Sequence, residues 1–310
     1  MPDTKKQHTV PQFYLRAFAS AKEKLFVYDK VQGRSFEAAV NDVAQKRRFY
    51  DIPRESVGID RDSGYDAQVV EHTLAEREGV LSKALGEFLR NSVNRDGIDQ
   101  EHRFALSYFM ALQMLRTPFM RTKMNEMEGR AFEHLASTEG PDTVAPGTPL
   151  YTQIHVDEGD LSLLQARIML NPMMSAQMMA PLIERIWCVG VNKTGHPLYT
   201  SDNPVVKYAH VDPPPGMVFG IGSEGVEVAL PLTPEIVLML WDGKAFPQMA
   251  RFEGKRMMLT DDDITYYNWL QVSASERQVF SSMHDFALAE KICQERPHLR
   301  DPKRQQVWVD

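Results

Sequence analysis

The chain has 310 residues, of which 43% are hydrophobic and 25% charged, a composition typical of soluble globular proteins. Its formal net charge of −7 argues against general affinity for polyanions over the whole surface. The two cysteines, Cys188 and Cys293, are too few and too far apart for a disulfide framework. They indicate buried, reduced thiols in a cytoplasmic protein.

No targeting or membrane segment is predicted. The first residues are not followed by an apolar segment of the kind found in secretory signals. The most membrane-like window, 168–183, is interrupted by Asn171, Pro172 and Pro181, and it is shorter than the ~20 apolar residues that a spanning helix needs. We expect a buried helix there and no membrane association.

The first fifty residues predict a short helix followed by a β-hairpin. Residues 11–19 are typical of a helix with proline in its first turn. Residues 24–29 are strand-like, a glycine turn follows, and 35–40 can return as the second strand. Residues 46–51 form another short extended segment.

This N-terminal region is also basic. Residues 1–50 contain ten Lys and Arg but five Asp and Glu, so the remaining residues carry a charge of −12. The asymmetry favours a nucleic acid or nucleotide as partner for the N-terminal end, with a solvated basic edge as the alternative.

The middle of the chain predicts helices. Residues 65–90 have an apolar face, and a second helix begins near Asp99 and should end or kink at Pro118, with helix resuming towards residue 135. Residues 140–149, rich in Pro, Gly and Thr, are the best linker candidate. A third helix is expected over 160–180.

After residue 183 the apolar pattern alternates, which predicts strands. The predicted strands cover 185–191, 197–200, 204–208, 226–232 and 236–241. Thr260 then caps a final helix that is expected to reach about residue 280. The prediction is an α+β fold, with a helical middle segment packed on a mainly antiparallel sheet from the C-terminal half plus an N-terminal hairpin. We expect one domain over 1–310, or a subdivision into 1–140 and 150–310.

Two stretches concentrate side chains able to do chemistry. In the first, Ser201 to Pro204, proline and Asx chemistry favour a tight turn that projects Asp202 and Asn203. Asp202 is a candidate general base or metal ligand, and the alternative is that it only binds turn amides. In the second, His8 can exchange protons near neutral pH, or it can pack with a polar tip exposed.

Other polar residues could bind an anionic substrate. Arg16 and Arg48 are candidate phosphate contacts, and Tyr14 and Asn203 could orient the substrate. Arg116 ends an apolar helix. With Glu71 it would form an ion pair or one wall of a polar pocket between the helices.

Seven blocks in order carry a family resemblance. They are HTVPQFYLRAF (8–18), LFVYDK (25–30), RFY (48–50), LQMLRTP (112–118), TSDNPV (200–205), LPLTP (230–234), and Asn268 with RQVFS (277–281). The pattern resembles the bacterial domain-of-unknown-function family numbered 4238, over about residues 8–282. The resemblance implies a single conserved unit in cytosolic bacterial or phage-associated proteins, and it brings no established activity.

The leading hypothesis is a hydrolase acting on a phosphate-containing substrate, RNA or a nucleotide, in a toxin or phage-defence setting. His8 and Asp202 would be the catalytic pair, and a divalent metal is the candidate cofactor. Substrate would be bound by Tyr14, Arg16, Arg48, Arg116 and Asn203. The rival hypothesis is a non-catalytic binding or regulatory module in which these residues brace the fold.

Overall fold

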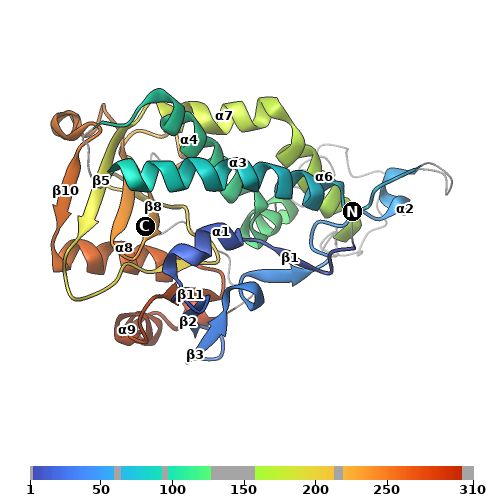
Figure 1. Cartoon of the computed structure of the whole chain (residues 1–310), viewed down its shortest axis with the longest axis horizontal. Coiled ribbons are helices and arrows are strands. Elements are labelled where there is room, and N and C mark those ends of the chain that lie inside the picture. The colour runs from blue at the N-terminus through green and yellow to red at the C-terminus, as the bar shows by residue number, and fades with distance from the viewer. Residues whose placement is uncertain (1–2, 59–63, 93–96, 127–157, 213–218, 302–310) are drawn as a thin grey trace, which may run out of the picture.

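The computed structural model describes residues 3–58, 64–92, 97–126, 158–212 and 219–301. Long helices lie along one side of the molecule, and the strands lie against and below them (Figure 1). The α+β prediction is confirmed, since helices and mainly antiparallel sheets form the described chain.

The larger sheet is built from the C-terminal half. Its strand order is β10-β5-β9-β8-β7, and among its described strands only the pairing of β10 with β5 is parallel. The strands are β5 (Ile186–Asn192), β7 (Val206–Ala209), β8 (Val226–Thr233), β9 (Ile236–Trp241) and β10 (Arg256–Leu259). Strand β10 was not predicted, because its sequence is short and half exposed.

The smaller sheet joins the two ends of the chain. Its order is β3-β2-β11-β6, so the predicted hairpin pairs with a strand from near residue 280. The strands are β2 (Lys24–Asp29), β3 (Arg34–Ala39), β6 (Thr200–Ser201) and β11 (Gln278–Ser281). The prediction of helix as far as residue 280 is wrong, because helix α8 (Asp261–Ala274) ends at Ser275 and β11 pairs with β2.

A third, two-stranded sheet pairs β1 (Lys6–His8) with β4 (Gln45–Arg47). Short helices follow strands β1, β3, β4, β9 and β11. They are α1 (Gln12–Leu15), η1 (Arg16–Phe18), η2 (Val40–Asp42), α2 (Arg54–Val57), η4 (Pro247–Phe252), α9 (Ala287–Glu295) and η5 (Pro297–Arg300).

The two long predicted helices are confirmed as α3 (Val69–Ser92) and α4 (Gln100–Arg116). Asp99 caps α4 by accepting a hydrogen bond from the His102 amide, and the helix ends at Thr117, just before Pro118. Residues 118–126 are again helical. The rest of that predicted helix and the predicted linker at 140–149 lie outside the described residues.

The third predicted helix is two helices, α6 (Glu158–Leu170) and α7 (Pro172–Ile183), so the prediction of one continuous helix is wrong. Pro172 has no amide hydrogen to donate to the preceding turn, and it begins a new helix instead. The Asn171 side chain caps that helix by accepting from the Met173 amide at 2.9 Å.

One hydrophobic cluster joins distant parts of the chain. It contains Tyr14 from α1, Leu112 from α4 and Leu230 from β8, all buried. The N-terminal segment is therefore packed between helices and sheet. Among the described residues, no helix is both long enough and apolar enough to cross a bilayer.

Candidate functional site

A pocket of about 350 Å³ opens where β1 and α1 meet helices α3 and α4. Figure 1 shows β1 leading into α1 alongside α3. Polar and apolar residues both line the pocket. They are His8, Gln12, Phe13, Arg16, Glu71, Leu74, Ala75, Glu78, Gly79, Ser82 and Arg116. Three residues that the sequence singled out, His8, Arg16 and Arg116, are therefore brought together here.

Arg116 forms the floor of this pocket and is 2% exposed. Its Nη1 donates to Glu78 Oε1 at 2.7 Å, and its Nη2 donates to the backbone carbonyl of His8 at 2.5 Å. The backbone carbonyl of Arg116 in turn accepts from the Tyr50 hydroxyl at 2.7 Å. Because a guanidinium stays ionised, a fixed positive charge lies under the pocket.

Glu71 does not form the predicted ion pair with Arg116, whose partner is Glu78. The alternative, that Glu71 is one wall of a polar pocket, is what the geometry shows. Burial raises the pKa of Glu71 to about 7, and the nearby negative charges of Glu78 and Asp51 add to the effect while Arg116 opposes it. Glu71 can therefore exchange a proton near neutral pH.

His8 faces the same pocket and is half-buried. Burial, and then the charge of Arg116, lowers the pKa of the His8 imidazole, so the ring is mainly neutral at pH 7. Its Nδ1 lies 3.4 Å from Gln12 Nε2. A backbone hydrogen bond with Asn41 opposes this lowering of the His8 pKa. Nε2 is itself buried, so a ligand in the pocket can reach it only if the imidazole ring turns.

Arg16 lies at the rim of the pocket, where its Nε contacts Glu23 Oε1 at 3.0 Å and its Nη2 contacts Gln12 Oε1 at 3.1 Å. The side chains of Arg16 and Glu23 are 46% and 64% exposed. Exposed ion pairs contribute little stability, so an anion entering the pocket could attract Arg16 at small cost.

The predicted residues Asp202 and Asn203 lie elsewhere. Asp202 Oδ1 accepts from the Glu276 amide, and Oδ2 accepts from the amides of Arg277 and Gln278, all at 2.8 Å. Asn203 donates to the Ala274 carbonyl at 3.1 Å. Asp202 thus ties the turn after β6 to the segment between α8 and β11, and neither residue lines the pocket of His8.

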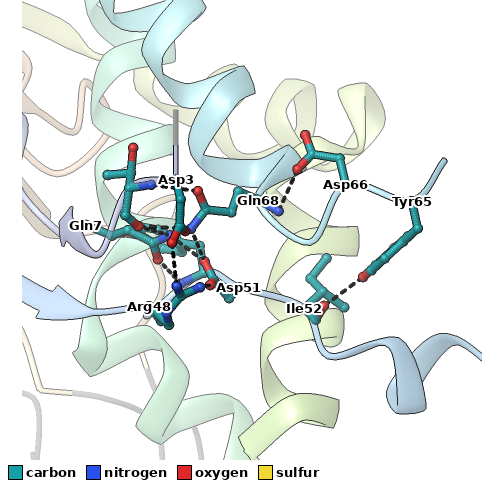
Figure 2. A network of polar contacts seen from close by, with 10 residues as sticks. Asp3, Gln7, Arg48, Asp51, Ile52, Tyr65, Asp66 and Gln68 are labelled. Carbon is teal, nitrogen blue, oxygen red and sulfur yellow. Dashed lines mark hydrogen bonds and ion pairs between the residues drawn. The ribbon is translucent and has the colours of Figure 1, made fainter. Parts of the chain in front are cut away.

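Arg48 and Tyr14 also lie outside this pocket. Figure 2 shows Arg48 facing Asp3 and Asp51, with which it forms ion pairs of 2.6 Å and 2.7 Å. Tyr14 is fully buried, and its hydroxyl donates to the Pro231 carbonyl at 2.5 Å. Both residues tie the N-terminal segment to the rest of the fold.

Sequence reasoning missed the part played by Gln12 and Gly79. Gln12 follows His8 by four residues and approaches its ring. Gly79 follows Glu78 in α3 and leaves room at the pocket, since a Cβ atom placed there would meet nothing within 4 Å. The sequence did offer one signal for this part of the pocket. Gly79 is a glycine inside a predicted helix that also carries Glu71 and Glu78, and a glycine in a helix interior usually has a packing or functional reason.

The described residues contain no group of three or more His, Cys, Asp or Glu side chains able to hold a metal ion. The predicted divalent metal therefore stays a prediction. The residues around His8 supply an imidazole, two carboxyl groups and two guanidinium groups. This set can move protons and bind an anion.

Comparison with known proteins identifies a family but no activity. No curated protein and no solved structure matches the chain significantly. A family model does match, over residues 6–285, and its description is a protein of unknown function, DUF4238. Because this match covers nearly the whole chain, the protein belongs to the DUF4238 family.

Proposed function

We propose that this protein cleaves phosphodiester bonds of RNA by acid–base catalysis in the pocket of His8, Glu71 and Arg116. One observation carries the proposal: a carboxyl group of pKa about 7 and an imidazole of lowered pKa line one pocket over a buried guanidinium. Groups that exchange protons near the working pH are the ones that general acid–base catalysis needs.

The pKa directions assign the roles. Between the lowered pKa of His8 and about 7, the imidazole is neutral and Glu71 is protonated. Neutral His8 accepts the proton of the 2′-hydroxyl as this oxygen bonds to phosphorus, and Glu71 donates its proton to the departing 5′-oxygen as the P–O bond breaks. The products are a 2′,3′-cyclic phosphate and a free 5′-hydroxyl, with the proton count unchanged.

The arginines stabilise the charge that develops on phosphorus. Arg116 supplies a fixed positive charge, and Arg16 can turn from Glu23 towards a phosphate. The base role of His8 needs its proton on Nδ1, where the Gln12 amide oxygen would accept it. In the structure Arg16 Nη2 donates to that oxygen at 3.1 Å. A phosphate that attracts Arg16 would therefore release Gln12 to orient the imidazole as a base.

The test is cleavage of a labelled RNA decamer by the purified protein, with EDTA and separately with Mg²⁺. His8→Ala and Glu71→Gln should each lower kcat by about 10²–10⁴, the usual contribution of a general acid or base. Glu76→Gln is the matched control, because Glu76 lies on the exposed side of the same helix. The proposal fails if the wild type cleaves no RNA, or if His8→Ala and Glu71→Gln act no differently from the control.

One observation favours the second candidate, a non-catalytic binding module. The carboxylate of Asp202, in the block TSDNPV, accepts hydrogen bonds from three backbone amides, and this arrangement stabilises the fold. Such a module would bind RNA or a nucleotide without changing it. Binding by wild type and Glu71→Gln alike, with no products under any condition, would select this candidate.

A further inference from the structure

The two-stranded sheet beside the pocket places positive charges side by side. In its register Lys6 pairs with Arg47, Gln7 with Lys46, and His8 with Gln45. Directly paired residues of antiparallel strands project from the same face, and residues two apart along one strand do so as well. Lys6, Arg47 and His8 therefore share one face, while Gln7 and Lys46 share the other.

That pairing is unfavourable in the protein alone. Like charges directly opposite one another destabilise a strand pair. Lys6 has an exposed ion pair with Asp42 at 2.9 Å, the two side chains being 61% and 54% exposed. The side chain of Arg47 is exposed, and it forms no hydrogen bond or ion pair with other side chains in the described part of the chain. A negatively charged ligand lying across Lys6 and Arg47 would relieve their repulsion.

The same face continues into the pocket. Lys6 stands two residues before His8, about 7 Å away along the strand. After burial and the charge of Arg116, the charge of Lys6 makes a smaller contribution to the lowered pKa of His8. Successive phosphates of an extended single strand are spaced by a similar distance, so one phosphate at His8 would put the next near Lys6.

We propose that the Lys6–Arg47 face binds the phosphate next to the one cleaved at His8, so that the substrate is a single-stranded oligonucleotide rather than a mononucleotide. The position of the cleaved bond at His8 rests on the proposed function. The binding of a phosphate by the Lys6–Arg47 face does not depend on cleavage. The opposite face supplies a contrast, since Lys46 there is engaged with Glu276 at 3.4 Å.

The experiment compares two charge-matched double variants, Lys6→Gln with Arg47→Gln, and Lys22→Gln with Lys46→Gln. Both remove two positive charges from the exposed N-terminal region. Binding is measured by anisotropy with a 2′-O-methyl RNA decamer, which cannot be cleaved, and with a DNA decamer. Cleavage is measured with an RNA decamer and with a dinucleoside monophosphate, which has only the scissile phosphate.

The first double variant should bind the 2′-O-methyl decamer about tenfold more weakly, and the magnitude of its slope of log K against log salt should fall by about 0.7, the value for one phosphate. Its kcat/KM should fall much further for the decamer than for the dinucleotide. Equal losses with both substrates, or equal effects of the two double variants, would overturn the inference. If the wild type cleaves no RNA, the proposed function fails, and the binding measurements still test whether the Lys6–Arg47 face binds a phosphate.

The DNA decamer tests whether the Lys6–Arg47 face distinguishes the phosphates of DNA from those of RNA. The Lys6–Arg47 face reads phosphates, so equal binding of DNA and RNA supports the face and leaves the choice of RNA to the 2′-hydroxyl chemistry at His8. No binding of either decamer by the wild type at low salt would refute the inference.

Discussion

Nη2 of Arg116 donates a 2.5 Å hydrogen bond to the backbone carbonyl of His8, across 108 positions of sequence. The last turn of α4 thereby holds the end of β1, and the same guanidinium holds Glu78 of α3 through Nη1. One side chain fixes three of the elements that form the pocket, so its loss should affect both stability and pocket geometry.

Arg116→Ala should lower the free energy of unfolding by about 3 kcal/mol, because it leaves the His8 carbonyl and the Glu78 carboxylate without their partner. Urea denaturation at pH 7 measures the change. Arg16→Ala is the control on the same pocket, and its exposed pair with Glu23 predicts a change within about 0.5 kcal/mol. Equal effects of the two substitutions would contradict the central position of Arg116.

Glu71→Gln should change how stability depends on pH. The pKa of Glu71 is raised from 4.5 to about 7 in the folded protein, so its favourable contribution is complete below pH 4.5 and is lost as pH rises through 7. The glutamine cannot ionise. At pH 8 the variant should be more stable than wild type by about 1–2 kcal/mol, after allowance for solvent access to the pocket.

Chemical denaturation at pH 4.5 and pH 8 tests this, with Glu76→Gln as the control on the exposed side of α3. The stability difference between Glu71→Gln and wild type should grow with pH, whereas the control should show no such trend. A constant difference would mean that Glu71 titrates normally in the folded state.

Cleavage should have a bell-shaped pH dependence. In kcat/KM the acidic limb reports the lowered pKa of His8, and the alkaline limb reports the pKa of about 7 of Glu71. The optimum should therefore lie slightly below neutrality. Glu71→Gln should lose the alkaline limb, while an unchanged limb would assign it to another group.

Asp202→Ala should act on folding and not on the chemistry of the pocket. Three backbone amides lose their acceptor, which should cost about 3 kcal/mol or more. Activity per folded molecule, measured well below the melting temperature, should stay close to that of wild type. A large loss of activity in a fully folded Asp202→Ala protein would restore the catalytic role that the sequence suggests.

The contrast between His8 and Asp202 shows how far the sequence leads. Local patterns predicted the turn at Asp202, but its acceptor role depends on amides 74 to 76 positions later, which no local pattern reveals. Similarly, Glu71 and Glu78 stand on one face of a predicted helix. Only the packing of α3 against α4 decides that Glu78 pairs with Arg116 and Glu71 does not.

Helices and strands were predictable where the pattern of apolar residues repeats over several turns or several alternating positions. Helices α3 and α4 and the strands β2, β8 and β9 follow from repeated apolar positions. Strand β11 did not, because it has four residues, begins soon after helix α8 and gains its conformation from pairing with β2 and β6. The break between α6 and α7 could have been predicted from Asn171 and Pro172, because Asn is a common helix cap and proline is favoured at the first position of a helix.

Narrowing the pocket without changing its polar groups gives a direct test of the site. Gly79 lies in α3 at the pocket, and a Cβ atom there would meet open space. Gly79→Leu should stabilise the helix by about 0.5–1 kcal/mol, because glycine is costly in a helix interior. The leucine side chain should at the same time narrow the pocket and raise KM for RNA.

Gly86, seven residues further along α3, is the matched control, since it does not line the pocket and a Cβ atom there would touch only the end of the Arg90 side chain, at 3.4 Å. Gly86→Leu should stabilise the helix to a similar extent and leave RNA cleavage unchanged. Thermal unfolding and initial rates measured on both variants separate helix stability from access to the pocket. If Gly79→Leu cleaves RNA as well as Gly86→Leu does, the result counts against this pocket as the place of the reaction, because a leucine side chain at its wall should hinder the substrate.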